Sequence, residues 1–264
     1  MSKNDVLADR NAKRVRRATR LAGRQYRKKV GLTRAEGPQA VLELLRNRPE
    51  LVREVFIEDS VRSKHPEIVQ LATANHDTYL MTSKVSESIT VSAQGVLAVL
   101  EVTPASKLPG AAALAVILPR TQDPGNLGTL IRLADAFGAE AVLVGPNGAD
   151  PFGPKVIRAS AGSVFHLPII SDIEFDDAVA QAHARQMRVV GTGLSASSRP
   201  LSQTVLAGPM AWVFGNEARG LTDAELQACD EVVRIEMNGR AESLNVAAAA
   251  AICLYEGAAA RGGA

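Results

Sequence analysis

The sequence predicts an α/β protein: a parallel sheet with helices on both faces, preceded by a small α/β domain. From residue 114 to residue 260, short continuous apolar segments alternate with segments of helical periodicity, which is typical of a parallel sheet buried on both faces. Residues 35–102 show a shorter alternation of the same kind. A segment that contains Pro104 and Pro109 separates the two regions and predicts a linker.

The small domain is expected to contain helices and strands in turn. Apolar residues recur at helical spacing in 36–46 and 65–75, which predicts two helices. Strands are predicted at 52–58, 78–81 and 95–102. The preceding residues are basic and thinly apolar, so we expect an N-terminal arm that need not be ordered alone.

The larger domain is expected to contain six strands with helices between and after them. Apolar runs predict strands at 114–118, 141–144, 164–167, 188–191, 211–214 and 232–235. Helical periodicity predicts helices at 127–137, 176–186, 223–229 and 244–260.

Composition excludes several classes of protein. With 46% hydrophobic and 22% charged residues in a chain of 264, collagen-like and wholly disordered chains are excluded. Cys229 and Cys253 form no metal-binding pattern, so we expect two buried thiols, a reducing compartment and no metal site. The N-terminus is charged, and no apolar stretch approaches the ~20 residues of a membrane span. We therefore expect a soluble, cytoplasmic protein.

The formal net charge of +2 conceals a strong asymmetry. Residues 1–34 contain twelve Lys and Arg against two Asp, a net charge of +10, which leaves −8 for residues 35–264. Such an arm predicts a polyanionic partner, nucleic acid first and an anionic membrane second, and is also compatible with a merely solvated arm. We expect phosphate contacts from five basic residues: Arg24, Arg27, Lys28, Lys29 and Arg34.

Three polar, glycine-containing loops follow predicted strands, at 119–128, 215–221 and 237–245. In an open parallel sheet, ligands bind in the loops at the carboxyl ends of the strands. Each loop alone is equally explained as an ordinary turn between a strand and a helix. The three together predict one ligand site.

Polar residues in these loops are candidates for that site. Asn126 can cap the helix that follows the first loop, and Arg132 lies six residues further on. Glu217 stands between two glycines, which allow a ligand to approach the backbone. Ser243 or Asn245 can cap the last helix, whose free N–H groups make a receptive polar site.

Several common catalytic signatures are absent from the sequence. It contains no GxGxxG after an early strand, no GxxxxGK[ST] and no GxSxG. The four histidines are scattered, and we interpret each as structural: His65, His76, His166 and His183.

The ordered set of loops resembles the SpoU (TrmH-type) RNA ribose 2′-O-methyltransferases of the SPOUT superfamily. The matching motifs are Asp-Pro-Gly-Asn-Leu-Gly at 123–128, Gly-Asn-Glu-Ala-Arg-Gly-Leu at 215–221 and Glu-Ser-Leu-Asn-Val at 242–246. Ala-Glu-Gly at 35–37 and Gln-Gly-Val-Leu-Ala at 94–98 resemble, more loosely, the family's N-terminal RNA-binding domain of ribosomal L30e type.

The resemblance implies a SPOUT α/β-knot fold, in which the C-terminal part of a parallel sheet forms a deep trefoil knot. It implies S-adenosylmethionine as cofactor and a homodimer whose interface helps build the active site. The chain would divide into the arm (1–34), an L30e-like RNA substrate-binding domain (35–104), a linker (105–112) and a SPOUT methyltransferase domain (113–264).

The resemblance also implies which residues form the site. The matching catalytic residues are Asn126, Arg132, Glu217, Ser243 and Asn245. Backbone contacts with the cofactor are expected around Gly193, Gly215, Ile235, Met237 and Leu244. Two positions depart from the family pattern, because Glu236 stands where proline is usual and Ala247 where serine is frequent.

The implied activity is S-adenosylmethionine-dependent methylation of a ribose 2′-hydroxyl in RNA. The separate N-terminal domain favours 23S-type rRNA, with tRNA as the alternative within this class. A non-catalytic RNA-binding or ribosome-assembly factor on the same scaffold is the alternative from another class, and the presence of all five catalytic matches argues against it. A nicotinamide enzyme would need a cofactor site without the dinucleotide signature.

The roles of these residues follow from their chemistry. A protonated guanidinium has no acceptor, so we expect Arg132 to bind the neighbouring phosphate and stabilise negative charge on the 2′-oxygen rather than act as the base. Asn126 and Ser243 would orient the ribose, and Asn245 would shape the turn beside the cofactor. Glu217 would orient Arg132 or Asn126.

Overall fold

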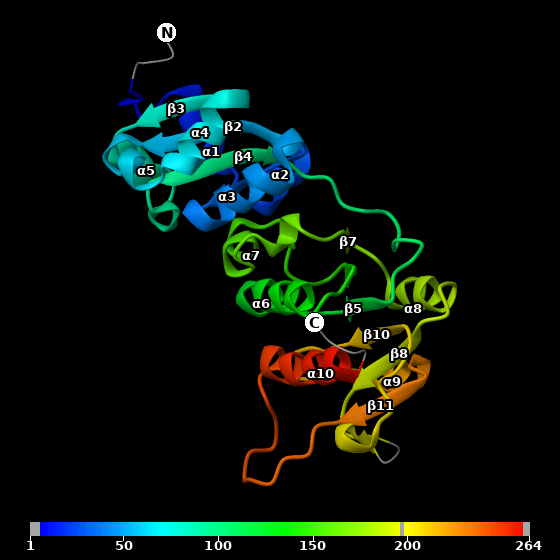
Figure 1. Cartoon of the computed structure of the whole chain (residues 1–264). Coiled ribbons are helices and arrows are strands. Elements are labelled where there is room, and N and C mark those ends of the chain that lie inside the picture. The colour runs from blue at the N-terminus through cyan, green and yellow to red at the C-terminus, as the bar shows by residue number, and fades with distance from the viewer. Residues whose placement is uncertain (1–5, 196–197, 261–264) are drawn as a thin grey trace. The chain divides into compact units, whose positions relative to one another are not determined.

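The computed structural model describes residues 6–195 and 198–260, and its contacts divide the chain into two compact units (Figure 1). The N-terminal unit comprises the chain up to Thr103 together with Phe152–His166. The C-terminal unit comprises Pro104–Pro151 and the chain from Leu167 onward. The first break falls in the proline-containing segment, and a short stretch of the later sequence returns to the N-terminal unit.

A four-stranded sheet forms the centre of the N-terminal unit, in the order β1–β4–β2–β3. β1 (Leu32–Glu36) and β2 (Val52–Glu58) flank β4 (Val96–Glu101) in antiparallel orientation, and β3 (Asp77–Met81) runs parallel to β2. β2, β3 and β4 confirm the three predicted strands to within one residue. The first five residues of β4 are buried, which explains its unbroken apolar sequence.

Five α-helices of the described chain before Thr103 pack around this sheet. α3 (Pro38–Asn47) and α4 (Pro66–Asn75) confirm the two predicted helices and pack against each other. α5 (Ser83–Ile89) follows β3, and Thr82 caps it through a bond from the Val85 N–H. α1 (Lys13–Arg20) and α2 (Arg24–Val30) lie within the basic arm.

The arm is folded into the core of this unit, which the sequence did not lead us to expect. α1 packs against α5 and buries Val15, Ala18 and Leu21 beside Phe56 and Leu97. These three residues recur every third position and therefore share one side of the helix. The intervening arginines, Arg16, Arg17 and Arg20, make this short apolar stripe hard to recognise in the sequence.

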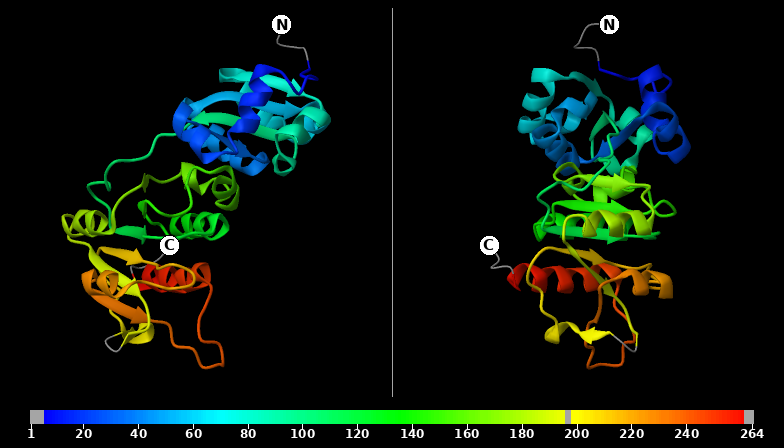
Figure 2. Two further views of the ribbon diagram at one scale, coloured as in Figure 1. Left: turned by 180° about the vertical axis from the view of Figure 1, so that it is seen from behind. Right: turned by 90° about the vertical axis from the view of Figure 1, so that its right-hand side faces the viewer.

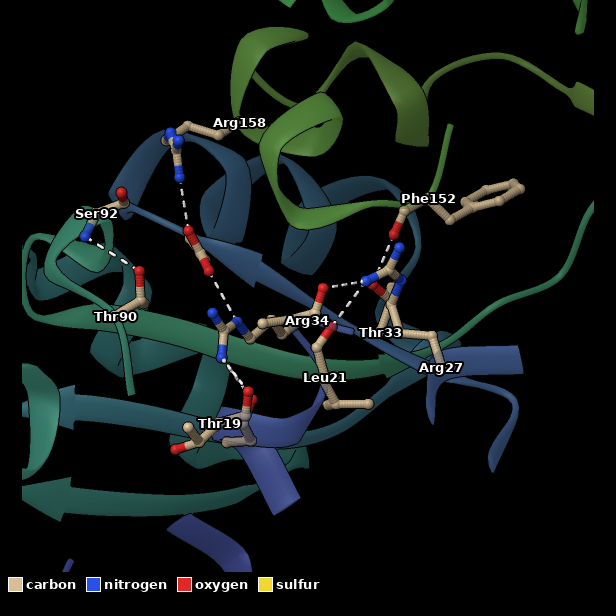
Figure 3. Close-up of polar contacts among 12 residues, drawn as sticks. Thr19, Leu21, Arg27, Thr33, Arg34, Thr90, Ser92, Phe152 and Arg158 are labelled. Carbon is tan, nitrogen blue, oxygen red and sulfur yellow. Dashed lines mark hydrogen bonds and ion pairs between the residues drawn. The ribbon is translucent and has the colours of Figure 1, made fainter. Parts of the chain in front are cut away.

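Two cations of the arm lie in the interior of the unit (Figure 3). Arg27 is 6% exposed and donates to two carbonyl oxygens just after α1, at 3.0 and 2.7 Å. Arg34 is 4% exposed and donates to the Ala18 carbonyl oxygen at 2.6 Å and to Glu36 Oε1 at 2.7 Å. Burial lowers the pKa of Arg34, and the adjacent Glu36 opposes that effect. We expected these two arginines to contact phosphate, and their burial contradicts that expectation. Their N–H groups instead donate to carbonyl oxygens at the end of α1, which have no partner within the helix.

Residues 152–166 dock on β1 within the same unit. Thr33 Oγ1 donates to the carbonyl oxygen of Phe152 at 2.6 Å, and Arg158 on α7 (Pro154–Ala159) donates to Glu36 Oε2 at 2.6 Å (Figure 3). Glu36 is 3% exposed and thus accepts from Arg34 and Arg158 in the interior. This ion-paired carboxylate explains how the polar β1, which the sequence did not predict, is a buried strand.

The strand predicted at 164–167 is wrong. Ser163–Phe165 form a 3-10 turn, and the strand β7 starts at Ile169. Gly162 precedes the turn with a φ of +96°, a backbone conformation that favours glycine. The apolar residues of the turn are buried within the N-terminal unit rather than in the sheet that follows. An apolar run predicts burial but does not identify the core in which it is buried.

Seven parallel strands form the sheet of the C-terminal unit, in the order β7–β6–β5–β10–β8–β11–β9. Five of the six predicted strands are confirmed to within one residue. The strands are β5 (Leu114–Leu118), β6 (Ala141–Val144), β7 (Ile169–Ser171), β8 (Arg188–Thr192), β9 (Arg199–Pro200), β10 (Met210–Val213) and β11 (Glu231–Arg234).

Helices cover both faces of this sheet, as predicted (Figure 2). α8 (Phe175–His183) and α9 (Asp223–Ala228) pack together on one face, over alternate apolar residues of the central strands. α6 (Pro124–Ala136) and α10 (Val246–Ala260) pack together on the other face. A Cβ added at Gly257 of α10 would lie 3.3 Å from the indole nitrogen of Trp212, so this helix approaches β10 closely.

The strand order brings the predicted loops to one edge of the sheet. The chain moves outward from β5 through β6 and β7, returns to β8 on the other side, and inserts β10 between β5 and β8. Such a reversal of strand order is where open α/β sheets bind ligands. Within the described residues, the structure contains no helix that meets the length and hydropathy needed to cross a membrane.

Candidate active site

The first loop leads into α6, which begins three residues earlier than predicted. Asp123, not Asn126, caps this helix, and its Oδ1 accepts from the Asn126 N–H at 2.8 Å. Asn126 therefore lies in the first turn of α6 with its side-chain amide available for other partners. The predicted capping role of Asn126 is wrong because the Asp-Pro pair starts the helix earlier, with proline at its first position.

The carboxylate of Glu217 joins the second loop to the first. Glu217 Oε1 accepts from Asn126 Nδ2 and from the Asp123 N–H, each at 3.3 Å. Glu217 Oε2 accepts from Asn216 Nδ2 at 3.1 Å and from the Gln122 N–H at 3.4 Å. One side chain therefore satisfies four donors, two of them backbone N–H groups of the first loop.

Asn245 joins the third loop to the first. Its Oδ1 accepts from the N–H groups of Ala247 and Ala248 at 2.9 and 3.4 Å, which confirms the prediction that a polar residue of this loop caps α10. Its Nδ2 donates to Asn126 Oδ1 at 3.2 Å. A continuous chain of hydrogen bonds thus runs from the start of α10 through Asn245 and Asn126 to Glu217, and it fixes the orientation of both amides.

The second loop is a tight turn held by its own backbone. Asn216 and Gly220 exchange two backbone hydrogen bonds of 3.0 and 2.9 Å, and Gly220 has a φ of +65°. A Cβ at Gly215 would lie only 2.3 Å from the carbonyl carbon of Gly220, so the backbone passes itself at a distance that only glycine allows.

The sequence did not identify Arg120 and Glu225 as parts of this site. Arg120 donates to both carboxylate oxygens of the buried Glu225, at 2.6 and 2.8 Å. Glu225 also completes a capping box with Thr222 at the start of α9. The Arg120 carbonyl oxygen accepts from Asn216 Nδ2 at 3.0 Å. These bonds fix the second loop to the end of β5, and a separation of 105 positions leaves no local sequence signal for the pair.

The second and third loops and the end of β8 enclose a cavity of about 390 Å³. Its volume is in the range of small-molecule sites. All five residues expected to contact the cofactor line it: Gly193, Gly215, Ile235, Met237 and Leu244. The catalytic candidates Glu217 and Ser243 also line it.

The cavity suits S-adenosylmethionine chemically. Leu194, Leu226 and Val233 supply apolar walls for a nucleoside, and backbone from two loops supplies polar groups. Glu217 and Glu242 add two carboxylates to the lining, which favours a ligand that carries positive charge. The residues present therefore fit the group that the motifs imply.

Two predicted catalytic residues lie outside the hydrogen-bond chain. Arg132 is on the exposed side of α6, and its side chain has no hydrogen-bond or ion-pair partner in the described part of the chain. Ser243 is exposed at the cavity. The structure therefore brings Asn126, Glu217 and Asn245 together and leaves these two at its surface.

The two departures from the family pattern have visible consequences. Ser202 Oγ donates to Glu236 Oε2 at 2.5 Å, a bond that fixes the start of the third loop where the family usually has proline. Ala247 contributes only its backbone, to the cap by Asn245. Both substitutions leave the loop anchored.

The thiol of Cys229, at the end of α9, is not a nucleophile. Burial, with a smaller contribution from Asp230 and Glu225, raises the pKa of Cys229 to about 12, so the thiol stays protonated at neutral pH. Its sulfur would lie 2.8 Å from a Cβ at Gly191, so Cys229 fills space beneath β8. Across 6–195 and 198–260 there is no group of three or more metal-binding side chains.

Comparison with known proteins agrees with this geometry. A family profile described as the SpoU rRNA Methylase family matches residues 113–255. A second profile, described as RNA 2′-O ribose methyltransferase substrate binding, matches residues 34–104. The chain is 34% identical over 238 residues to the 23S rRNA (guanosine(2553)-2′-O)-methyltransferase RlmP of Bacillus subtilis (strain 168), which covers 89% of this chain and 92% of RlmP.

Solved structures show the same fold. The AdoMet-bound rRNA methyltransferase from Sinorhizobium meliloti superposes with a TM-score of 0.83 at 27% identity, over 96% of this chain and 97% of that one. The SpoU methyltransferase AviRb from Streptomyces viridochromogenes, in complex with AdoMet, gives 0.82 at 27% identity, over 93% and 97%. These likenesses confirm the SPOUT α/β fold with a small domain before it. The chain belongs to the SpoU rRNA methylase family.

Proposed function

We propose that this chain transfers a methyl group from S-adenosylmethionine to a ribose 2′-hydroxyl of 23S rRNA. The observation that carries the proposal is the hydrogen-bonded chain of Glu217, Asn126 and Asn245 beside a cavity lined by all five expected cofactor contacts. The family match supports the activity. Relatives named 23S rRNA methyltransferases support this RNA over tRNA. Such a substrate points to the cytoplasm.

S-adenosylmethionine supplies an electrophilic methyl on a positively charged sulfur. Backbone around Gly193, Gly215 and Met237 would hold this cofactor in the cavity. The chain itself must then align the ribose hydroxyl with the methyl, and such alignment supplies roughly 7–11 kcal/mol of a barrier in the best intramolecular cases.

Asn126 is suited to orient the ribose. Its Nδ2 gives one N–H to Glu217, and its Oδ1 takes one bond from Asn245, which leaves one N–H and one acceptor position on a fixed amide. Ser243, exposed at the cavity, would give a second contact. Glu217 acts through Asn126 as a positioning residue, and Asn245 sets the turn beside the cofactor.

Arg132 is suited to bind phosphate and to stabilise negative charge on the 2′-oxygen. It is exposed and has no side-chain partner among the described residues, so its donors are available to the substrate. A guanidinium is a strong donor to phosphate and carries no acceptor for a proton.

The exposed face of α2 is suited to bind the RNA backbone. Arg24, Lys28 and Lys29 are exposed there, whereas Arg27 and Arg34 of the same arm are buried. Exposed cations attract phosphates over distances near the Debye length. The family profile for substrate binding matches the sheet domain that follows α2.

We also propose a homodimer that forms through α10. Tyr255 and Ile252 on this helix are 61% and 38% exposed, and the ring of Tyr255 contacts Phe137 edge-on with centroids 6.2 Å apart. Exposed aromatic and aliphatic residues on one helix are typical of an interface between subunits. A second subunit bound there would help complete the active site, where the side chain of Arg132 is exposed to solvent in the single chain.

Methyl transfer tests the function directly. The purified chain with tritiated S-adenosylmethionine is expected to label unmodified 23S rRNA transcribed in vitro, at a ribose 2′-oxygen, and not tRNA.

Arg132→Lys is expected to lower kcat by about 100-fold while RNA binding is kept, because lysine lacks the planar pair of donors. Near-wild-type turnover of Arg132→Lys would exclude a need for the guanidinium. A wild-type chain that binds RNA but labels none would favour the non-catalytic alternative.

Glu217→Gln tests the bond that joins the loops. A carboxamide places an N–H₂ group against donors and loses at least two of the four hydrogen bonds, so kcat/KM is expected to fall about 10- to 100-fold. Glu174→Gln is the matched control, because Glu174 is exposed at the start of α8 and makes no side-chain cap. Equal activity of the two variants would contradict the positioning role.

The exposed cations of α2 are tested by charge removal. Deletion of residues 1–34 would also remove most of β1, so we choose the triple variant Arg24→Gln, Lys28→Gln, Lys29→Gln. The slope of log K for rRNA against log salt is expected to become shallower by about 2, since each neutralised phosphate contributes about 0.7–0.9. Arg62→Gln, Lys64→Gln, Lys84→Gln removes the same charge from the same unit. An identical slope change in this control would argue against a specific role of α2.

The dimer is tested by Tyr255→Asp. A charge on the exposed part of α10 is expected to convert a dimer to a monomer, measured by sedimentation at micromolar concentration. Val205→Asp, at an apolar residue that is 70% exposed on a loop of the same unit, is expected to leave the dimer intact. A wild-type monomer would rule out this interface.

A further inference from the structure

The C-terminal unit is acidic, although the proposed substrate is a polyanion. It contains ten Lys and Arg against sixteen Asp and Glu, a net charge of −6. Carboxylates also line the cavity, at Glu217 and Glu242. These groups favour a cationic cofactor, but they repel an RNA backbone that must come close to it. Cations near the cavity are therefore required for the substrate to enter.

Five of the nine Lys and Arg residues that the structure describes in this unit have intramolecular partners. Carboxylates pair with Arg120, Arg188 and Arg199. Backbone carbonyls accept from Arg185 and Arg234. These ion pairs and hydrogen bonds occupy N–H donors of the five side chains, which leaves fewer donors for a ligand.

Four cations of the unit have no side-chain partner among the described residues. All four are exposed: Lys107, Arg132, Arg219 and Arg240. Three of them belong to the elements that form the site. Lys107 lies in the proline-containing segment before β5 and is the exception. In the described part of this unit, the unpaired positive charge is therefore concentrated on the active-site elements.

Arg219 projects from a rigid support. Its backbone N–H and that of Ala218 donate to Asn216 Oδ1 at 3.3 and 3.0 Å, and the turn is closed by the two bonds between Asn216 and Gly220. Arg219 lines the cavity. An exposed guanidinium on a fixed turn loses little backbone entropy when it binds.

Arg240 holds an equivalent place on the third loop. It lies between Met237 and Glu242, which both line the cavity, and residues 238–245 are exposed. Ser202 anchors the start of this loop through Glu236, and Asn245 anchors its end at α10. The loop therefore presents Arg240 to solvent between two fixed points.

We propose that Arg219 and Arg240 bind backbone phosphates of the RNA beside the methylated nucleotide, in addition to the phosphate proposed for Arg132. This rests on the proposed function, because a ribose within an RNA strand is linked to one phosphate at its 5′ position and to another at its 3′ position. Guanidinium groups bind phosphate oxygens through paired N–H donors. Their positive charge offsets the carboxylates of the cavity, which would otherwise repel this part of the strand.

The test compares Arg219→Gln and Arg240→Gln with Lys107→Gln, which removes the same charge from an exposed, unpaired cation of the same unit away from the cavity. Binding of a 23S rRNA fragment transcribed in vitro is measured at a series of salt concentrations, and S-adenosylmethionine binding is measured by calorimetry. Each arginine variant is expected to make the salt slope shallower by about 0.7–0.9 and to raise KM for the RNA about tenfold. The Kd for S-adenosylmethionine is expected to stay within about twofold. Lys107→Gln is expected to match the wild type.

Arg219→Lys and Arg240→Lys separate charge from geometry. Both are expected to keep the wild-type salt slope and to recover part of the affinity, because lysine retains the charge but not the paired donors. Salt slopes of the glutamine variants equal to that of Lys107→Gln would overturn the proposal. A tenfold loss of S-adenosylmethionine affinity with unchanged RNA binding would instead assign the arginine to the cofactor. Absence of methyl transfer by the wild type would refute the proposed function, while the binding comparison would still decide whether these arginines contact RNA.

Discussion

The site depends on one carboxylate that joins loops nearly a hundred residues apart in the chain. Glu217 accepts two backbone N–H groups of the first loop, which lie outside any strand or helix ladder, and two side-chain amides. Polar backbone left without partners costs about as much as a lost hydrogen bond. Glu217 removes that cost for the first loop and fixes Asn126 at the same time. Asn126 then fixes Asn245, which caps α10.

This carboxylate can reach the first loop only because of the strand order. β10 is inserted beside β5, although β6, β7, β8 and β9 lie between them in the chain. The loops after β5 and β10 therefore leave the same edge of the sheet side by side. Arg120 and Glu225 add a second connection between the same two segments. The cavity is thus enclosed by loops that carry no regular structure but are fixed at several points.

The sequence predicted the sheet well, and it predicted the three loops that come together beside the cavity, because both leave local signals. Buried parallel strands such as β5 and β6 are unbroken apolar runs, and the three motifs keep their order and spacing. Residues whose partners are distant were missed. β1 is a buried strand only because Glu36 pairs with Arg34 and Arg158. The apolar residues Val164 and Phe165 are buried in the N-terminal unit and not in the sheet of the C-terminal unit. Asn126 was misread as a cap because Asp123 and Pro124 start α6 earlier.

Net charge by sequence position was an incomplete guide to how the molecule uses its cations. The arm carries twelve Lys and Arg, but Arg27 and Arg34 are buried in the N-terminal unit, where they donate to carbonyl oxygens and, for Arg34, to a carboxylate. A protein that binds both a cationic cofactor and a polyanionic strand meets opposite electrostatic demands. Carboxylates at the cavity serve the first demand and oppose the second. Long-range attraction must then come from a separate basic surface, and local contacts from arginines that have no carboxylate partner among the described residues. Salt screens exposed charges over about 8–10 Å at physiological ionic strength, so the negative potential at the cavity and the positive potential of a separate basic surface can exist in one chain.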